Sequence, residues 1–154
     1  MVKYPNEKEM RTANLIGAIT ANVYMLLVIA VFIARMLGQL EIGQWIGLAS
    51  TLAIIPLAYL FVIGLDTNRR MIYFVWLGLM ILFVLVELII DHIFQLDFRS
   101  VQWAVILYVM FFFGATGGMI GVAAQAGRLW ASVTGTIFLI MAALAFIQRA
   151  VTGL

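Results

Sequence analysis

The chain of 154 residues is 66% hydrophobic and only 10% charged, and its mean hydropathy is +1.14. A soluble domain has roughly 45–50% apolar and about 25% charged residues, so this composition excludes an ordinary water-soluble globular protein. The formal net charge of +2 lies mostly in short segments between apolar runs. It bears on orientation in a membrane, and we expect no binding to nucleic acid.

Several residue types on which common chemistry depends are missing or rare. There is no cysteine, which excludes disulfides, thiolate metal sites and iron–sulfur clusters. The only lysines are Lys3 and Lys8, near the start of the chain, so no lysine lies in a span to form a buried Schiff base. His92 is the only histidine, so one chain cannot ligate haem through two histidines. We therefore expect no cofactor and assign no metal ligand.

Long apolar runs predict an all-α, polytopic bundle of about five transmembrane helices in a single domain. Windows without charged residues extend over 12–34, 42–65, 100–127 and 129–148. A helix needs roughly 20 residues to cross a hydrocarbon core about 30 Å thick. A further window, Met71–Val86, is long enough only if Glu87 is included. Barrel strands are a weaker alternative, because they alternate apolar and polar residues, whereas Leu26–Ala34 is continuously apolar.

The expected spans, in chain order, are about 13–37, 44–65, 71–94, 101–126 and 129–150. The first follows a charged segment, Met1–Arg11, and is longer than the 7–15 residues typical of a signal-peptide core. We therefore expect it to be retained as a span. The loops between spans are short, so consecutive helices should run antiparallel.

The basic residues predict the orientation of the bundle. With a cytoplasmic N-terminus, the inner side carries Lys3, Lys8, Arg11, Arg69, Arg70 and Arg128, and the outer side carries Arg35, Arg99 and Arg149. An excess of Lys and Arg marks the cytoplasmic side. We expect a multi-pass protein of the plasma or inner cell membrane, embedded in the lipid bilayer, with the N-terminus inside and the C-terminus outside.

The first two spans each contain an unusual residue. Asn22 follows Asn14 and Ala18 at four-residue spacing, a stripe that favours close helix packing with a hydrogen bond between helices. Alternatively, Asn22 lines a polar pathway. Pro56 lies inside the second span. Because proline has no N–H to donate, we expect a kink near Ser50–Thr51.

The third span contains the main candidate for a functional group. Glu87 lies 17 residues after Arg70, about 25 Å along a helix, and so about one turn short of the outer end. Asp91, four residues later, shares its face. His92 is rotated by about 100° from Asp91, so all three converge only if the helix breaks.

A carboxyl group within a span is costly and marks a candidate functional site. The candidate ion or proton site comprises Glu87, Asp91, His92 and Asp97. Two carboxylates at this spacing repel each other, which favours a shared proton or cation. The alternative is that Glu87 faces water or pairs with an arginine on the same side.

The fourth span contains two overlapping GxxxG spacings, formed by Gly114 with Gly118 and by Gly117 with Gly121. In lipid, this spacing lets helix backbones approach closely. The partner helix is expected in the same chain or in another copy. A phosphate-binding loop is excluded, because no strand precedes the glycines and the GxxxxGKS/T pattern is absent.

Three classes of function remain. The favoured class is a non-catalytic helix bundle that self-associates or forms a subunit of another membrane complex. This function requires only helix faces of small residues that can pack against a partner, and the sequence contains such faces. The second is a small ion- or proton-coupled transporter or channel that uses Glu87 and Asp91. The third is a membrane enzyme acting on lipid or quinone, for which few catalytic groups are present. No catalytic residue is assigned.

Overall fold

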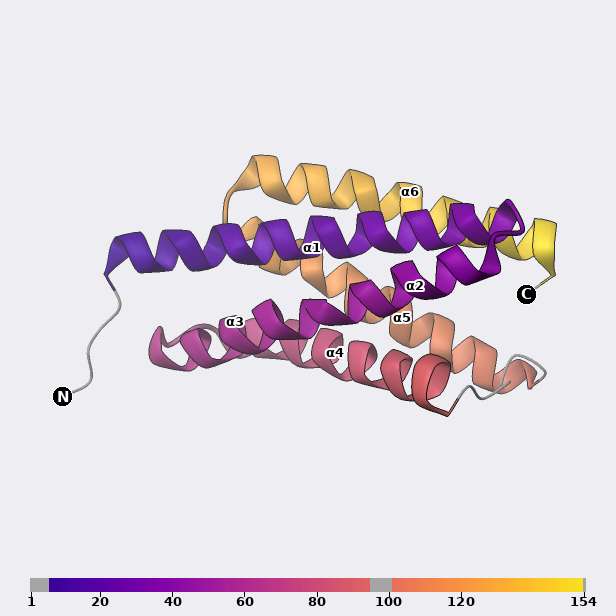
Figure 1. Cartoon of the computed structure of the whole chain (residues 1–154). Helices are drawn as coiled ribbons and strands as arrows, with labels where there is room; N and C mark the ends of the chain where they lie inside the picture. The colour runs from indigo at the N-terminus through magenta and orange to yellow at the C-terminus, as the bar shows by residue number, and fades with distance from the viewer. Residues whose placement is uncertain (1–5, 95–100, 154) are drawn as a thin grey trace.

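The computed structural model describes residues 6–94 and 101–153, and every regular element in these ranges is helical (Figure 1). The elements are α1 (Glu7–Met36), α2 (Leu40–Ser50), a 3₁₀ turn (Thr51–Ala53), α3 (Ile54–Asp66), α4 (Met71–Glu87), a π turn (Leu88–Ile93), α5 (Gln102–Ala124) and α6 (Arg128–Thr152). Five helical segments are long and apolar enough to cross a membrane: Glu7–Met36, Leu40–Asp66, Met71–Ile93, Gln102–Ala124 and Arg128–Thr152. The predicted fold class is confirmed.

The first helix begins at Glu7, six residues earlier than the expected span. Asn6 caps it: the side-chain Oδ1 accepts a hydrogen bond from the backbone N of Lys8 at 2.7 Å, and the backbone N of Asn6 donates to Glu9 Oε2 at 3.1 Å. These reciprocal bonds satisfy backbone donors that the first turn of a helix leaves free. The helix therefore extends through a charged segment that hydropathy alone assigns to the tail.

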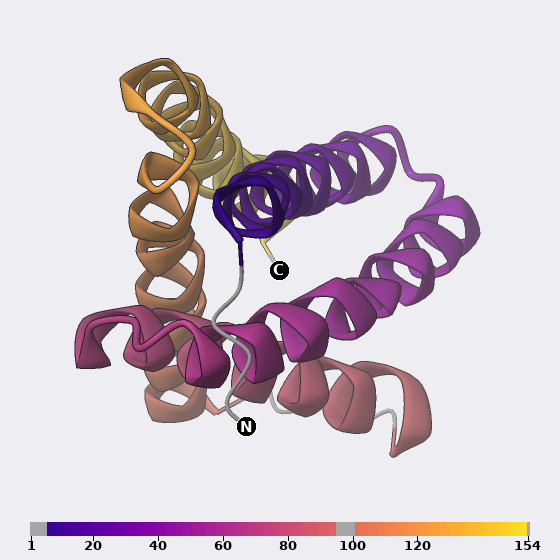
Figure 2. The same ribbon diagram turned by 90° about the vertical axis from the view of Figure 1, so that its left-hand side faces the viewer.

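The helices form two groups joined by an oblique helix. α1 and α6 lie side by side, α3 and α4 lie on the other side of the bundle, and α5 runs obliquely from the α4 side to the α6 side (Figures 1 and 2). Accordingly, α5 packs against α1, α4 and α6, and α1 also packs against α2, α3 and α6. Because α5 starts beside α4, it diverges from α1 and α6 at the end where those two helices terminate.

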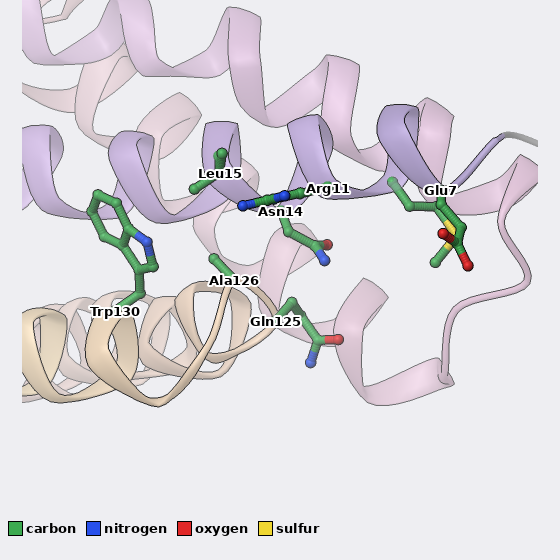
Figure 3. A pocket seen from close by; sticks show the side chains of 8 residues that line it. Glu7, Arg11, Asn14, Leu15, Gln125, Ala126 and Trp130 are labelled. Carbon is green, nitrogen blue, oxygen red and sulfur yellow. The ribbon is translucent and has the colours of Figure 1, made fainter.

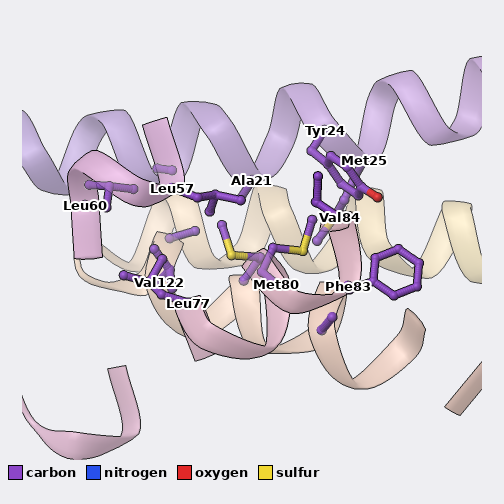
Figure 4. Packing of buried hydrophobic residues seen from close by; sticks show 14 of the residues in the cluster. Ala21, Tyr24, Met25, Leu57, Leu60, Leu77, Met80, Phe83, Val84 and Val122 are labelled. Carbon is purple, nitrogen blue, oxygen red and sulfur yellow. The ribbon is translucent and has the colours of Figure 1, made fainter. Parts of the chain in front are cut away.

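The core is formed by apolar side chains from most of the helices. Its largest fully buried members include Tyr24, Met25, Leu57, Leu60, Leu77, Met80, Phe83, Val84 and Val122 (Figure 4). Large apolar side chains also cover the outside, as shown by Trp45, Met71 and Leu129, which are 65%, 79% and 75% exposed. Exposed apolar surface on this scale is typical of contact with lipid.

The second span changes its helical form just before Pro56. The 3₁₀ turn at Thr51–Ala53 separates α2 from α3, and Pro56 is the third residue of α3. Ser50 Oγ donates to the carbonyl oxygen of Gly47 at 2.6 Å, and Thr51 Oγ1 donates to that of Leu48 at 2.7 Å. Because proline has no N–H, the carbonyl group one turn before it loses its usual hydrogen-bond donor, and a tighter turn changes the local bonding pattern. The change of helical form therefore occurs beside Ser50–Thr51, where the kink is expected.

The glycines of α5 make room for rings. A Cβ added at Gly118 would lie 3.0 Å from Trp76 Cδ1, and one added at Gly121 would overlap the same indole, with Cε3 at 2.7 Å. A Cβ added at Gly117 would lie 3.7 Å from Phe138 Cζ of α6, and one added at Gly114 would meet nothing within 4 Å. The nearest atoms thus belong to aromatic side chains of the same chain, and not to the closely approaching backbone that the spacing suggests.

Asn22 makes its hydrogen bond within its own helix. Its side-chain Nδ2 donates to the carbonyl oxygen of Ala18 at 2.9 Å, while Oδ1 is buried without a partner among the described residues. Within the part of the chain that the structure describes, Asn22 therefore does not form the expected hydrogen bond to a neighbouring helix.

Candidate functional site

A cavity of about 610 Å³ lies where α1, α4 and α6 end and α5 begins. We call it the end cavity. Its lining comes from four of the helices and from Ser50 at the end of α2. The first half of α5 lies beside α4 and away from the ends of α1 and α6 (Figures 1 and 2).

The lining is ordered from polar to apolar along the helix axes. On α5 it runs from Gln102, the first residue of the helix, to Phe113, 11 residues and so about 16 Å further on. On α1 it runs from Val28 to Arg35, about 10 Å nearer the helix end. The rim carries Arg35, Asp91, Gln102 and Arg149, whereas the deeper lining includes Val28, Phe32, Val105, Val109, Phe112, Phe113 and Ala145. The end cavity therefore has a charged rim and a mostly apolar interior, which also contains the polar side chains of Ser50, Glu87 and Tyr108.

Two of the predicted site residues meet in this cavity. Glu87 is the last residue of α4, Asp91 lies in the π turn that follows, and both line the cavity. Tyr24 of α1, which is 2% exposed, donates its hydroxyl hydrogen to Glu87 Oε2 at 2.9 Å. Arg35 and Asp91 are the charged groups that act electrostatically on Glu87. Glu87 thus sits in a polar group that ties α1 to α4.

The other two predicted site residues are not placed in this group. His92 faces α2: its Nε2 lies 3.5 Å from the carbonyl oxygen of Gln44, its ring packs beside Gly47, and it does not line the end cavity. Although the helix widens into a π turn here, the widening does not bring His92 to the carboxylates. Asp97 lies outside the described residues. Within 6–94 and 101–153, no cluster of three His, Asp or Glu side chains could hold a metal ion.

Sequence reasoning missed Gln148. Its side chain is only 6% exposed and lines the end cavity. Arg149 beside it also lines the cavity and is exposed. A polar residue at the end of an apolar span is usually interpreted as lying at the membrane interface. The glutamine at this position therefore did not indicate a cavity.

The opposite end of the bundle is tied together by Arg69. Its Nη2 donates to Asn14 Oδ1 at 2.6 Å, its Nη1 donates to Gln125 Oε1 at 3.1 Å, and its guanidinium lies 5.2 Å from the centre of the Tyr73 ring. These contacts join α1 to the start of α4 and the end of α5. A smaller cavity of about 370 Å³ lies beside them, between the start of α1 and the start of α6, lined by residues that include Glu7, Arg11, Asn14, Gln125 and Trp130 (Figure 3).

No protein-family model, curated protein or solved structure matches this chain. We therefore infer a function from the chemistry of the end cavity.

Proposed function

We propose that this protein is a multi-pass membrane bundle whose end cavity binds an amphiphile, a molecule with a polar head and an apolar tail. The observation that carries the proposal is the order of the lining, with Arg35, Asp91 and Arg149 at the rim and Phe112 and Phe113 deeper. A head group at the rim keeps its polar contacts near the membrane interface. The tail leaves its contacts with membrane lipid and packs against aromatic and aliphatic side chains of the cavity.

The size of the end cavity supports the same conclusion. Its volume of about 610 Å³ falls within the range of roughly 300–1,000 Å³ typical of small-molecule sites, which combine a mostly apolar lining with a few polar groups that orient the ligand. One acyl or isoprenoid chain with a compact head fits this description.

Binding without catalysis accounts best for the groups that are present. The one histidine faces α2 and is absent from the cavity lining, so Glu87 and Asp91 have no imidazole beside them. We retain the interpretation of a non-catalytic bundle. Self-association or a second subunit stays a prediction, as does the cytoplasmic N-terminus, which would place the end cavity at the outer face.

A second candidate is proton- or cation-coupled transport of the same amphiphile. The observation that favours it is the presence of both Glu87 and Asp91 in the cavity lining. Transport would require the Arg69 contacts at the other end to open. For this candidate, Glu87→Gln should abolish proton- or cation-dependent flux in proteoliposomes. Wild-type vesicles with no more flux than empty ones would count against it.

The binding proposal is tested by filling the cavity. Ala145 lines it, whereas Ala143 on the same helix is exposed and takes no part in the lining. Both alanines can be replaced by phenylalanine, so the two variants add the same ring on different sides of α6.

Native mass spectrometry of protein extracted from its own membrane in an uncharged detergent measures the retained amphiphile. Wild type and Ala143→Phe should carry it equally, and Ala145→Phe should lose at least about tenfold in occupancy, the effect of roughly 1.4 kcal/mol of binding energy. Equal occupancy in both variants, or no retained amphiphile in wild type, contradicts the proposal.

A further inference from the structure

We propose that the smaller cavity, between the start of α1 and the start of α6, binds a phosphate group carried by an anionic lipid or by a soluble phosphate ester. This cavity, here called the Arg11 cavity, has a volume of about 370 Å³ and lies at the opposite end of the bundle from the end cavity. The arrangement that points to a phosphate is a set of hydrogen-bond donors in the lining, two of which are oriented by Arg69.

Arg69 fixes the orientation of two amides that line the Arg11 cavity. It donates through Nη2 to Asn14 Oδ1 at 2.6 Å and through Nη1 to Gln125 Oε1 at 3.1 Å, and both amide side chains belong to the lining. A guanidinium group can only donate, so the atoms that face Arg69 must be the amide oxygens. The other polar atom of each amide is its nitrogen, and both side chains therefore offer N–H donors to a ligand in the cavity.

Arg11 and Trp130 add further donors to the lining. The Arg11 side chain is exposed and extends away from Glu7 toward Leu15 (Figure 3). Its guanidinium is thus separated from Glu7, the one acidic residue of the described lining. Trp130 contributes an indole N–H, which can donate but not accept. A phosphate suits this set of groups, because its oxygens are strong acceptors and an arginine can bind two of them at once.

The charges at this end of the bundle also favour an anion. The described residues there include five basic and three acidic side chains. These are Lys8, Arg11, Arg69, Arg70 and Arg128, and Glu7, Glu9 and Asp66. Basic pockets between membrane-spanning helices are typical sites for the phosphate heads of anionic lipids. The excess of positive charge attracts a phosphate and disfavours a cationic ligand.

The apolar part of the lining favours a lipid as the carrier of the phosphate. Leu15 and Trp130 lie together on one side of the cavity, further along their helices, and Asn14 and Gln125 lie on the other side (Figure 3). A lipid phosphate beside the two amides places its glycerol and the first carbons of its acyl chain beside Leu15 and Trp130. A soluble phosphate ester uses the same donors without this apolar surface.

The test compares phosphate-bearing and neutral probes added to the purified full-length protein in an uncharged detergent. The probes are a lysophosphatidylglycerol, a monoacylglycerol of the same chain length and glycerol 3-phosphate, and native mass spectrometry gives the affinity of each. Lysophosphatidylglycerol should bind at least about tenfold more tightly than monoacylglycerol, and equal affinities would overturn the proposal. Glycerol 3-phosphate binding as tightly as the lysolipid identifies a soluble ester as the ligand, and much weaker binding identifies a lipid.

A matched pair of variants on α1 locates the binding. Arg11→Gln should weaken the binding of lysophosphatidylglycerol by at least about tenfold. Lys8→Gln removes the same charge from an exposed side chain of the same helix that is outside the lining, and it should change the affinity by less than about twofold. Equal losses in the two variants would mean that the probe responds to the total charge of this end, and would overturn the assignment to the cavity.

Gln125→Glu tests the amide orientation that Arg69 imposes. The variant keeps an oxygen for Arg69 and replaces the amide nitrogen by a second oxygen with a negative charge. Unfolding in SDS should therefore show no loss of stability, while the affinity for lysophosphatidylglycerol should fall by at least about tenfold. Unchanged affinity would contradict the role of this amide as a donor.

The end cavity provides the last control, because it is proposed to bind an amphiphile as well. Ala145→Phe fills the end cavity and should leave the binding that depends on Arg11 unchanged. If Ala145→Phe removes the binding of lysophosphatidylglycerol and Arg11→Gln does not, the probe binds in the end cavity and the proposed phosphate site is wrong.

Discussion

Gly121→Ala tests how tightly α4 and α5 pack. The indole of Trp76 lies across Gly118 and Gly121, so that a Cβ at Gly121 would overlap the six-membered ring, while a Cβ at Gly118 would lie 3.3 Å from Trp76 Cβ and Cγ. The ring cannot leave Gly121 without rotating about bonds that are held close to Gly118. Alanine at position 121 therefore displaces the indole or separates the helices.

The expected magnitude follows from two opposing terms. Overpacking typically costs about 1–3 kcal/mol, while replacing glycine by alanine within a helix contributes roughly 0.5–1 kcal/mol of stability. Gly121→Ala should thus lower the free energy of unfolding by up to about 2.5 kcal/mol. A Cβ added at Gly114, on the same helix, would meet nothing within 4 Å, so Gly114→Ala should be neutral or slightly stabilising. The difference between the two variants isolates the overpacking term.

Reversible unfolding by SDS in mixed micelles, followed by tryptophan fluorescence, measures both free energies. Trp76→Phe combined with Gly121→Ala should be more stable than the separate effects predict, because the smaller ring removes the overlap. If Gly121→Ala and Gly114→Ala are equally stable, the indole does not occupy the space beside Gly121 and the packing argument is wrong.

Further predictions concern the polar contacts and the orientation. Arg69→Ala should lower the free energy of unfolding by about 1–3 kcal/mol, because two hydrogen bonds between elements are lost. Arg70→Ala removes the same charge from an exposed side chain and should change the free energy of unfolding by less than about 0.5 kcal/mol. Similar losses for the two variants in SDS unfolding would contradict the role of the Arg69 contacts. A double-mutant cycle with Tyr24→Phe and Glu87→Gln should give a coupling energy of about 0.5–2 kcal/mol, and zero coupling would mean that the hydrogen bond does not stabilise the bundle. Since the chain has no cysteine, Gln39→Cys should react with a membrane-impermeant maleimide on intact cells; labelling only after permeabilisation would reverse the orientation.

The spans were predictable because their signal is local. Charge-free windows and the length needed to cross a bilayer gave each helix to within a few residues, except at the start of α1. There the Asn6 cap extends the helix through charged residues, and hydropathy does not register capping. The change of helical form before Pro56 is local as well, since a missing N–H affects the preceding turn of the same helix.

Contacts between helices were less predictable. Periodicity shows that Gly118 and Gly121 lie near one face of a helix, but not that the indole of Trp76 covers them. The same limit applies to Asn22, whose hydrogen bond stays within α1. Glu87 and Asp91 were recognised as candidates because carboxylates are rare in spans. Gln148 was not, because its place in the cavity lining depends on the divergence of α5 from α6, and so on the packing of the whole bundle.

The most direct test of the central claim is a crystal structure determined from a lipidic mesophase, with wild type and Ala145→Phe compared. The account predicts elongated electron density in the end cavity of wild type, with its head at the rim formed by Arg35, Asp91 and Arg149 and its tail along Phe112 and Phe113, and no such density in the variant. A wild-type cavity closed by side chains, or occupied by water alone, would contradict the claim that this bundle binds an amphiphile.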